Sequence, residues 1–120
     1  MVSKAGAKHV AKMLGVNGSL TSLDLSNNKL CGVCKNGEGT FTTEGITAIA
    51  DALRVNGSLT KMSLAENKLK TEGTKAICEA LEQNKTLKEL DISGSNIGGK
   101  AGAKHVAKML GVNGSLTKME

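Results

Sequence analysis

The chain has 120 residues, 39% of them hydrophobic, and its 16 basic and 11 acidic residues leave a net charge of +5. This length allows a single domain with a modest core. The lysines are spread along the chain, and Phe41 is the sole aromatic residue. A nucleic-acid partner is therefore not expected, because its surface would need clustered cations and stacking aromatic side chains.

Composition also bears on location. No stretch approaches the ~20 apolar residues of a membrane-spanning helix, and the first residues lack the apolar centre of a signal peptide. We therefore expect no membrane partner. The three cysteines are an odd number, which favours a reducing compartment over a disulfide-bonded secreted protein. A cytoplasmic location is the expectation.

A segment near the start of the chain occurs again near its end. The segment Lys4–Thr21 is identical to Lys100–Thr117 over all eighteen positions. Apolar residues at helical spacing predict a helix in both copies, and two related helices over Glu44–Asn56 and Glu72–Asn84. One glycine near the start of each helix marks the repeat: Gly6, Gly45, Gly73 and Gly102, with spacings of 39, 28 and 29 residues. The longer first spacing indicates an insertion.

The helices have recognisable start and end signals. Thr43 and Thr71 fit as N-caps, and each is followed by a glutamate that complements the positive end of the helix. The helix ends carry an asparagine, usually followed by glycine, which predicts a left-handed residue that terminates the helix. These asparagines also form N-x-S/T sequons, although their regular placement favours capping; they are Asn17, Asn56, Asn84 and Asn113.

A strand motif follows each helix. Residues Leu20–Leu30 fit LxxLxLxxNxL, in which leucines two positions apart point to the same side of a strand. Leu23 and Leu25 therefore face inward and Asp24 faces outward. The asparagine amide can satisfy backbone groups of the turn after the strand. The motif returns at Leu59, Met62, Leu64, Asn67 and Leu69, then at Leu87, Leu90, Ile92 and Ile97 with Ser95 in place of the asparagine, and begins again at Leu116 and Met119.

This pattern resembles the leucine-rich repeat family, and the helix before each strand is similar to its ribonuclease-inhibitor-like class, found also in the sensor arms of NOD-like receptors. The resemblance covers nearly the whole chain and implies an α/β solenoid of about three and a half repeats. Its parallel sheet would line the concave side, and its helices would cover the convex side. One domain is expected over 1–120, with units at about 4–30, 44–69, 72–97 and 100–120 and an insertion at 31–43.

The insertion contains Cys31, Cys34 and Phe41. A C-x-x-C pair can supply half of a zinc site, but four ligands are usual and the sequence has no second pair, so no metal is expected. A redox dithiol would need a helix N-terminus or nearby cations, whereas this pair follows a strand turn. We expect Cys31 to pack as a small apolar residue, Cys34 to lie on a loop and Phe41 to anchor the insertion.

No set of residues indicates a catalytic site. His9 and His105 align with alanines of the inner helices, which places them near the edge of the apolar face, and no nucleophile shares their repeat position. Cys78 aligns with Ala11 and is expected to be a small buried residue. The sequence therefore predicts neither an enzyme nor a cofactor site.

The outward positions of the strands form three rows across the predicted sheet. These are Ser22, Lys61, Glu89 and Lys118; then Asp24, Ser63, Asp91 and Glu120; then Ser26, Ala65 and Ser93. The family resemblance implies that this concave face binds partner proteins, so we expect a non-catalytic interaction scaffold. The candidate partner-binding residues are Asp24, Lys61, Glu66, Glu89, Asp91 and Lys118. The rows lack aromatic and arginine anchors, so weak binding is expected.

Self-association is the alternative function. The fourth repeat stops within its strand, which leaves an open sheet edge, and the first repeat begins without a polar cap. The chain is then a piece of a longer array or a module that associates head to tail, because its first and fourth repeats are nearly identical. Recent duplication and engineering would both give such repeats. A further alternative is a redox or metal role for the loop with Cys31 and Cys34.

Overall fold

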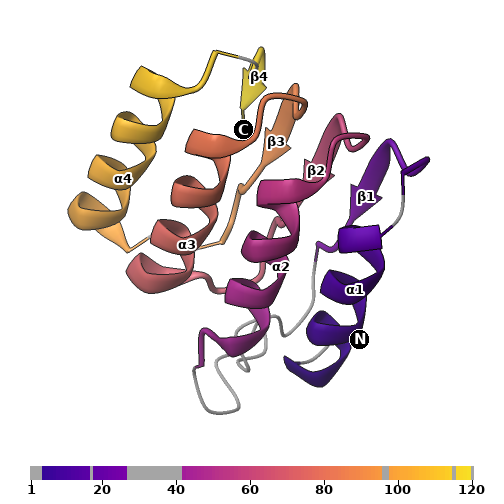
Figure 1. Ribbon diagram of the computed structural model, residues 1–120. Helices are drawn as coiled ribbons and strands as arrows, with labels where there is room; N and C mark the ends of the chain where they lie inside the picture. Colours follow the sequence, from indigo (N-terminus) through magenta and orange to yellow (C-terminus); the bar gives the residue numbers. More distant parts are fainter. Residues whose placement is uncertain (1–3, 17, 27–41, 96–97, 115, 120) are drawn as a thin grey trace.

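The computed structural model describes residues 4–16, 18–26, 42–95, 98–114 and 116–119. A helix and a strand alternate four times within them, in the order α1 Lys4–Val16, β1 Ser22–Asp24, α2 Glu44–Val55, β2 Lys61–Ser63, α3 Lys70–Gln83, β3 Glu89–Asp91, α4 Gly99–Val112 and β4 Lys118–Met119. The helices form one layer and the strands a second layer beside it (Figure 1). The predicted insertion with its two cysteines and Phe41 lies outside the described residues, apart from its last two positions.

The strands form one parallel sheet in the order β1-β2-β3-β4. Their pairing is in register, so the outward residues align in rows as predicted. The first row is Ser22, Lys61, Glu89 and Lys118, and the second contains Asp24, Ser63 and Asp91. Glu120, expected in the second row, lies outside the described residues. The predicted α/β repeat solenoid is confirmed.

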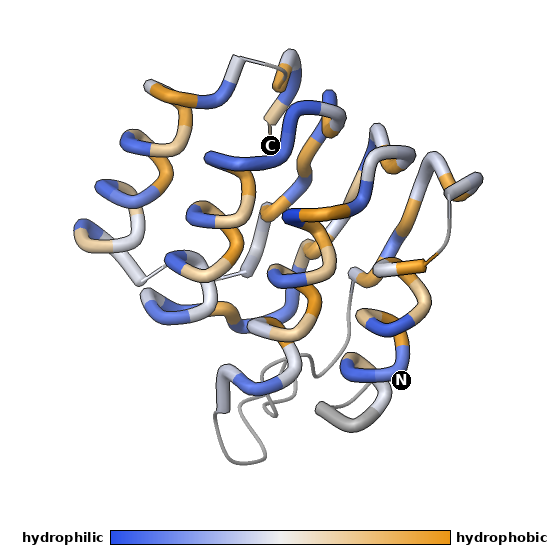
Figure 2. Tube along the Cα trace, viewed as in Figure 1, coloured by the Kyte–Doolittle hydropathy of each residue, from blue (hydrophilic) through white to orange (hydrophobic). Residues whose placement is uncertain are grey.

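The core lies between the two layers and consists of aliphatic side chains. Ile46, Ile49 and Leu53 of α2 are fully buried, and so is Met62 of β2. Hydrophobic and hydrophilic positions alternate along the helices, as an amphipathic layer requires (Figure 2). Burying each such side chain contributes roughly 1.5–3 kcal/mol. Neighbouring helices of the described part of the chain pack on one another, so adjacent repeats share this core. Cys78 is buried at 2% exposure, as predicted.

The asparagines at the helix ends have a different role from the predicted one. Their backbone is extended, with φ of −75°, −88° and −83° at Asn56, Asn84 and Asn113, so the prediction of a left-handed residue there is wrong. Each side-chain amide instead donates to a carbonyl of the preceding repeat. The pairs are Asn56 with Leu14, Asn84 with Leu53 and Asn113 with Leu81, at 2.9, 2.8 and 2.6 Å. These bonds satisfy carbonyls that the end of a helix leaves unpaired.

The turn after each strand uses the motif asparagine as predicted. The Asn67 amide is fully buried and donates to the Leu64 carbonyl of its own turn at 3.0 Å and to the Leu25 carbonyl of the preceding repeat at 2.8 Å. Ser95 stands in the asparagine position of the next repeat, and its hydroxyl donates to the Leu64 carbonyl at 2.6 Å. The shorter side chain therefore keeps the bond between repeats.

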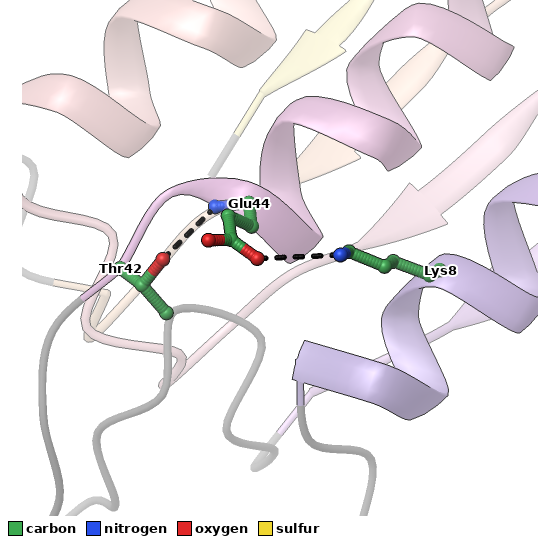
Figure 3. Close-up of polar contacts among 3 residues, drawn as sticks. All are labelled: Lys8, Thr42 and Glu44. Carbon is green, nitrogen blue, oxygen red and sulfur yellow. Dashed lines mark hydrogen bonds and ion pairs between the residues drawn. The ribbon is translucent and has the colours of Figure 1, made fainter.

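The helix starts follow the sequence signals in part. Thr43 precedes α2 but makes no side-chain capping bond; the Glu44 amide donates to the hydroxyl oxygen of Thr42 at 3.3 Å (Figure 3). Thr71 lies inside α3, which begins at Lys70, so its prediction as an N-cap is wrong. A polar contact also joins the first two helices, since the Lys8 ammonium lies 3.2 Å from the Glu44 carboxylate (Figure 3).

Candidate functional site

A hollow of about 440 Å³ lies over the outward side chains of the sheet. All six candidate residues line it: Asp24, Lys61, Glu66, Glu89, Asp91 and Lys118. The remaining lining residues are Ser26, Met62, Ser63, Ala65, Leu90 and Ser93. Alternation of side chains along in-register strands brings residues from four repeats to one face, which explains the gathering.

Two aspartates in the second row are held by serines two positions further along the chain. Ser26 donates its hydroxyl to Asp24 at 2.6 Å and its backbone amide at 2.9 Å. Ser93 makes the same pair of bonds to Asp91, also at 2.6 and 2.9 Å. In both cases the hydroxyl bond, followed by the amide bond, lowers the pKa of the carboxyl below its ordinary value. Both aspartates are therefore ionised and fixed in orientation at neutral pH.

The sequence places Ser26 and Ser93 in the outward rows but does not mark them as site residues. The available signal was the D-x-S spacing, which occurs at Asp24 and again at Asp91. A serine two residues after an aspartate can donate back to it in a short local turn. The sequence thus contained this feature, whereas the hollow itself required the neighbouring strands.

The first row has the opposite balance of charge. The Lys118 ammonium lies 3.9 Å from the Glu89 carboxylate, with both side chains partly exposed. Lys61, on the other side of Glu89, forms no ion pair with any residue that the structure describes. Four carboxylates and two ammonium groups line the hollow. This face is therefore acidic, although the net charge of the chain is +5.

The groups that could perform other chemistry lie away from this face or are inert. His9 and His105 are on helices α1 and α4, and burial raises the pKa of the Cys78 thiol to about 12. In the described part of the chain no cluster of histidine, cysteine and acidic residues could hold a metal ion. No described helix is long and apolar enough to cross a membrane. The arrangement is suited to contacts with another molecule.

Comparisons with known proteins agree with this fold. Family models described as leucine-rich repeat match residues 19–39 and 83–104. The solved structure of leiomodin-1 actin-binding site 2 is 20% identical, with a TM-score of 0.72, and the match covers 92% of this chain and 58% of that one. The tropomodulin C-terminal domain from Caenorhabditis elegans is 17% identical, with a TM-score of 0.72 and coverage of 95% and 62%. No curated protein matches significantly.

These matches and the observed repeats lead to one conclusion. Four helix–strand units, stacked in register on one parallel sheet, carry the sequence motif that two family models recognise. The chain is a leucine-rich repeat protein. It spans 58% and 62% of the length of the two similar structures, and identities of 20% and 17% show a shared fold alone.

Proposed function

We propose that this leucine-rich repeat protein binds a partner protein through the hollow on its sheet face. The observation that carries the proposal is the pair of aspartates, Asp24 and Asp91, which serines hold at the same height on two strands. Fixed charges favour binding because less side-chain freedom is lost on contact. One structure with this fold is named for an actin-binding site, which supports protein binding as a use of the fold.

The two rows of charge define the chemistry of the partner. A lysine or arginine would face Asp24 and Asp91, and a carboxylate would face Lys61 in the adjacent row. The rows are two residues apart along the strands, which is about 7 Å. Serines between the charged residues add hydrogen bonds but no anchor, so the contact is weak unless other surfaces contribute.

The proposal includes finer predictions. We expect the chain to be non-catalytic. We also expect it to belong to the ribonuclease-inhibitor-like class, because a helix precedes each strand. A cytoplasmic location is expected because the number of cysteines is odd. We also expect the partner to leave the helix surface of the molecule uncovered, since the candidate residues all lie on the strands or the turns that follow them.

A charge-swap experiment tests the site. The double variant Lys61→Glu with Glu89→Lys keeps the net charge and exchanges the two charges on β2 and β3 in the first row, while Lys118 on β4 is unchanged. Its matched control, Lys75→Glu with Glu79→Lys, makes the same exchange on exposed residues of α3. Partner capture by the purified wild-type chain and both variants would be quantified by mass spectrometry, with folding checked by circular dichroism.

We expect the hollow variant to lose its specific partner and the control to keep it. Loss of one close charge pair and creation of a like-charge contact would weaken binding by roughly tenfold or more. Equal capture by the hollow variant and the wild-type chain would remove the first row from the site. Loss in the α3 variant alone would move the site to the helix surface.

A further inference from the structure

Each aspartate in the second row of the hollow has one carboxylate oxygen engaged by its serine. The Oδ1 atom of Asp24 accepts both the hydroxyl and the amide of Ser26, at 2.6 and 2.9 Å. The Oδ1 atom of Asp91 accepts the same two groups of Ser93 at the same two distances. The Oδ2 atoms accept no hydrogen bond from the described part of the chain. An oxygen of an ionised carboxylate accepts about two bonds, so both Oδ1 atoms are filled.

Aspartate and serine occur together in the first three repeats. The first and third repeats carry D-x-S, which begins at Asp24 and at Asp91. The second repeat has Ser63 and Ala65 at the equivalent positions, so it lacks both the acid and the serine that would hold it. This pairing indicates that the serine serves the aspartate, and is not a general requirement of the turn after a strand.

The register of the sheet sets the spacing of the two aspartates. Asp24, Ser63 and Asp91 are partners on the adjacent strands β1, β2 and β3, which lie side by side (Figure 1). Neighbouring strands are about 4.8 Å apart, which places the aspartates about 10 Å from each other. All three residues line the hollow. The face of the sheet therefore offers two separate acceptors, each with one carboxylate oxygen open to another molecule.

Lysine and arginine would use these acceptors differently. An arginine pairs most strongly with a carboxylate as a fork, with one N–H group on each oxygen. That geometry needs the Oδ1 atoms, which Ser26 and Ser93 already fill. A lysine ammonium is a compact point charge that needs a single oxygen. Lysine therefore keeps its full interaction at Oδ2, whereas arginine loses one of its two bonds.

We propose that the second row of the hollow selects a partner with two lysine side chains about 10 Å apart, in preference to arginine. The inference rests on the proposed function and deepens it, because it names the side chains that the hollow takes. Asp24 and Asp91 make the contacts with the partner. Ser26 and Ser93 are positioning residues that set the preference for lysine through the two carboxylates.

The test is a selection of binders from displayed helical peptides of about 18 residues, in which lysine and arginine are equally frequent at the varied positions. A helix gives a known spacing, since residues seven apart lie on one side and about 10.5 Å apart along the axis. The purified chain is the target. Peptides that also bind the double variant Asp24→Asn with Asp91→Asn are removed, so the remaining peptides require the two carboxylates.

The decisive second target is the double variant Ser26→Ala with Ser93→Ala. It removes the hydroxyl bonds and opens one acceptor position on each Oδ1 atom, while the backbone amides stay. Ser22→Ala is the matched control, because Ser22 is an exposed residue of β1 outside the lining of the hollow. Circular dichroism checks that each target folds. If the double variant does not fold, Ser93→Ala alone takes its place.

We expect the wild-type chain and Ser22→Ala to select lysine over arginine by roughly threefold or more, in pairs seven residues apart. The variant without the two serines should select arginine at least as often as lysine. Equal selection of arginine by the wild-type chain, an unchanged lysine preference without the serines, or lysines at other spacings would overturn the inference. The proposed function would stand in these cases, since the peptides still require the carboxylates.

A selection that leaves no peptide dependent on Asp24 and Asp91 would also overturn the inference. Partner capture with the exchange of Lys61 and Glu89 then judges the proposed function separately, because that exchange lies in the first row and leaves both aspartates unchanged.

Discussion

The first and fourth repeats contain the same eighteen residues in two settings. Both copies form a helix followed by a strand, α1 with β1 and α4 with β4. Their buried sides nevertheless differ, because α1 has a neighbour on one side and α4 has its neighbour on the other. The comparison teaches that this sequence specifies its local structure by itself, while the adjacent repeat decides which side chains become core.

The largest expected effect on stability is the difference between substitutions of Leu14 and Leu110, which occupy the same position in the first and fourth repeats. Leu14 is fully buried, so Leu14→Ala leaves a cavity and should lower the free energy of unfolding by about 2–5 kcal/mol. Leu110 is half exposed, and Leu110→Ala should cost about 1 kcal/mol or less. Urea denaturation of dilute protein measures both values. Equal losses would mean that the two repeats have the same environment.

The methionines should show the opposite order. Met109→Ala removes a fully buried side chain and should cost about 2–3 kcal/mol, less than a leucine because neighbours fill the space of a flexible side chain more readily. Met13→Ala, at a partly exposed position, should cost under about 1 kcal/mol. The same denaturation series measures them. A larger loss for Met13 would contradict the assignment of buried sides.

The smallest effect concerns Cys78, which occupies the position of Ala11 and Ala107. Burial, followed by the negative charges of Glu82 and Glu79, raises the thiol pKa from 9.0 to about 12, so the folded state holds the neutral thiol. This contribution is present below pH 9 and is lost as the pH rises, because the unfolded thiol ionises first. Stability should fall by about 1 kcal/mol between pH 9 and pH 10 from this group.

Cys78→Ala supplies the comparison for that titration, since alanine stands at the same position in the outer repeats. Urea denaturation at several pH values would be recorded for both proteins. The difference between their stabilities should narrow as the pH rises through this range. A difference that stays constant with pH would show that the thiol does not ionise on unfolding.

The candidate site could be predicted in outline from the sequence. The spacing of Leu23, Met62 and Leu90 predicts which strand residues face outward. It also predicts that Lys61 lies beside Glu89, as the observed register shows. The hollow and the fixed orientation of Asp24 could not be derived in this way. They depend on the distance between strands and on a hydroxyl rotamer, which no repeat pattern encodes.

The repeat motif determined the order of helices and strands, the parallel sheet and the role of Asn67, because apolar periodicity and a buried amide act within one unit and its immediate neighbour. Tertiary structure decided the rest. Asn56 was predicted to end its helix in a left-handed conformation, but in the structure its side-chain amide donates to the Leu14 carbonyl of the preceding repeat, which lies within reach. Tertiary structure also buried Leu14 and exposed Leu110, since an identical sequence acquires its core only from what is stacked beside it.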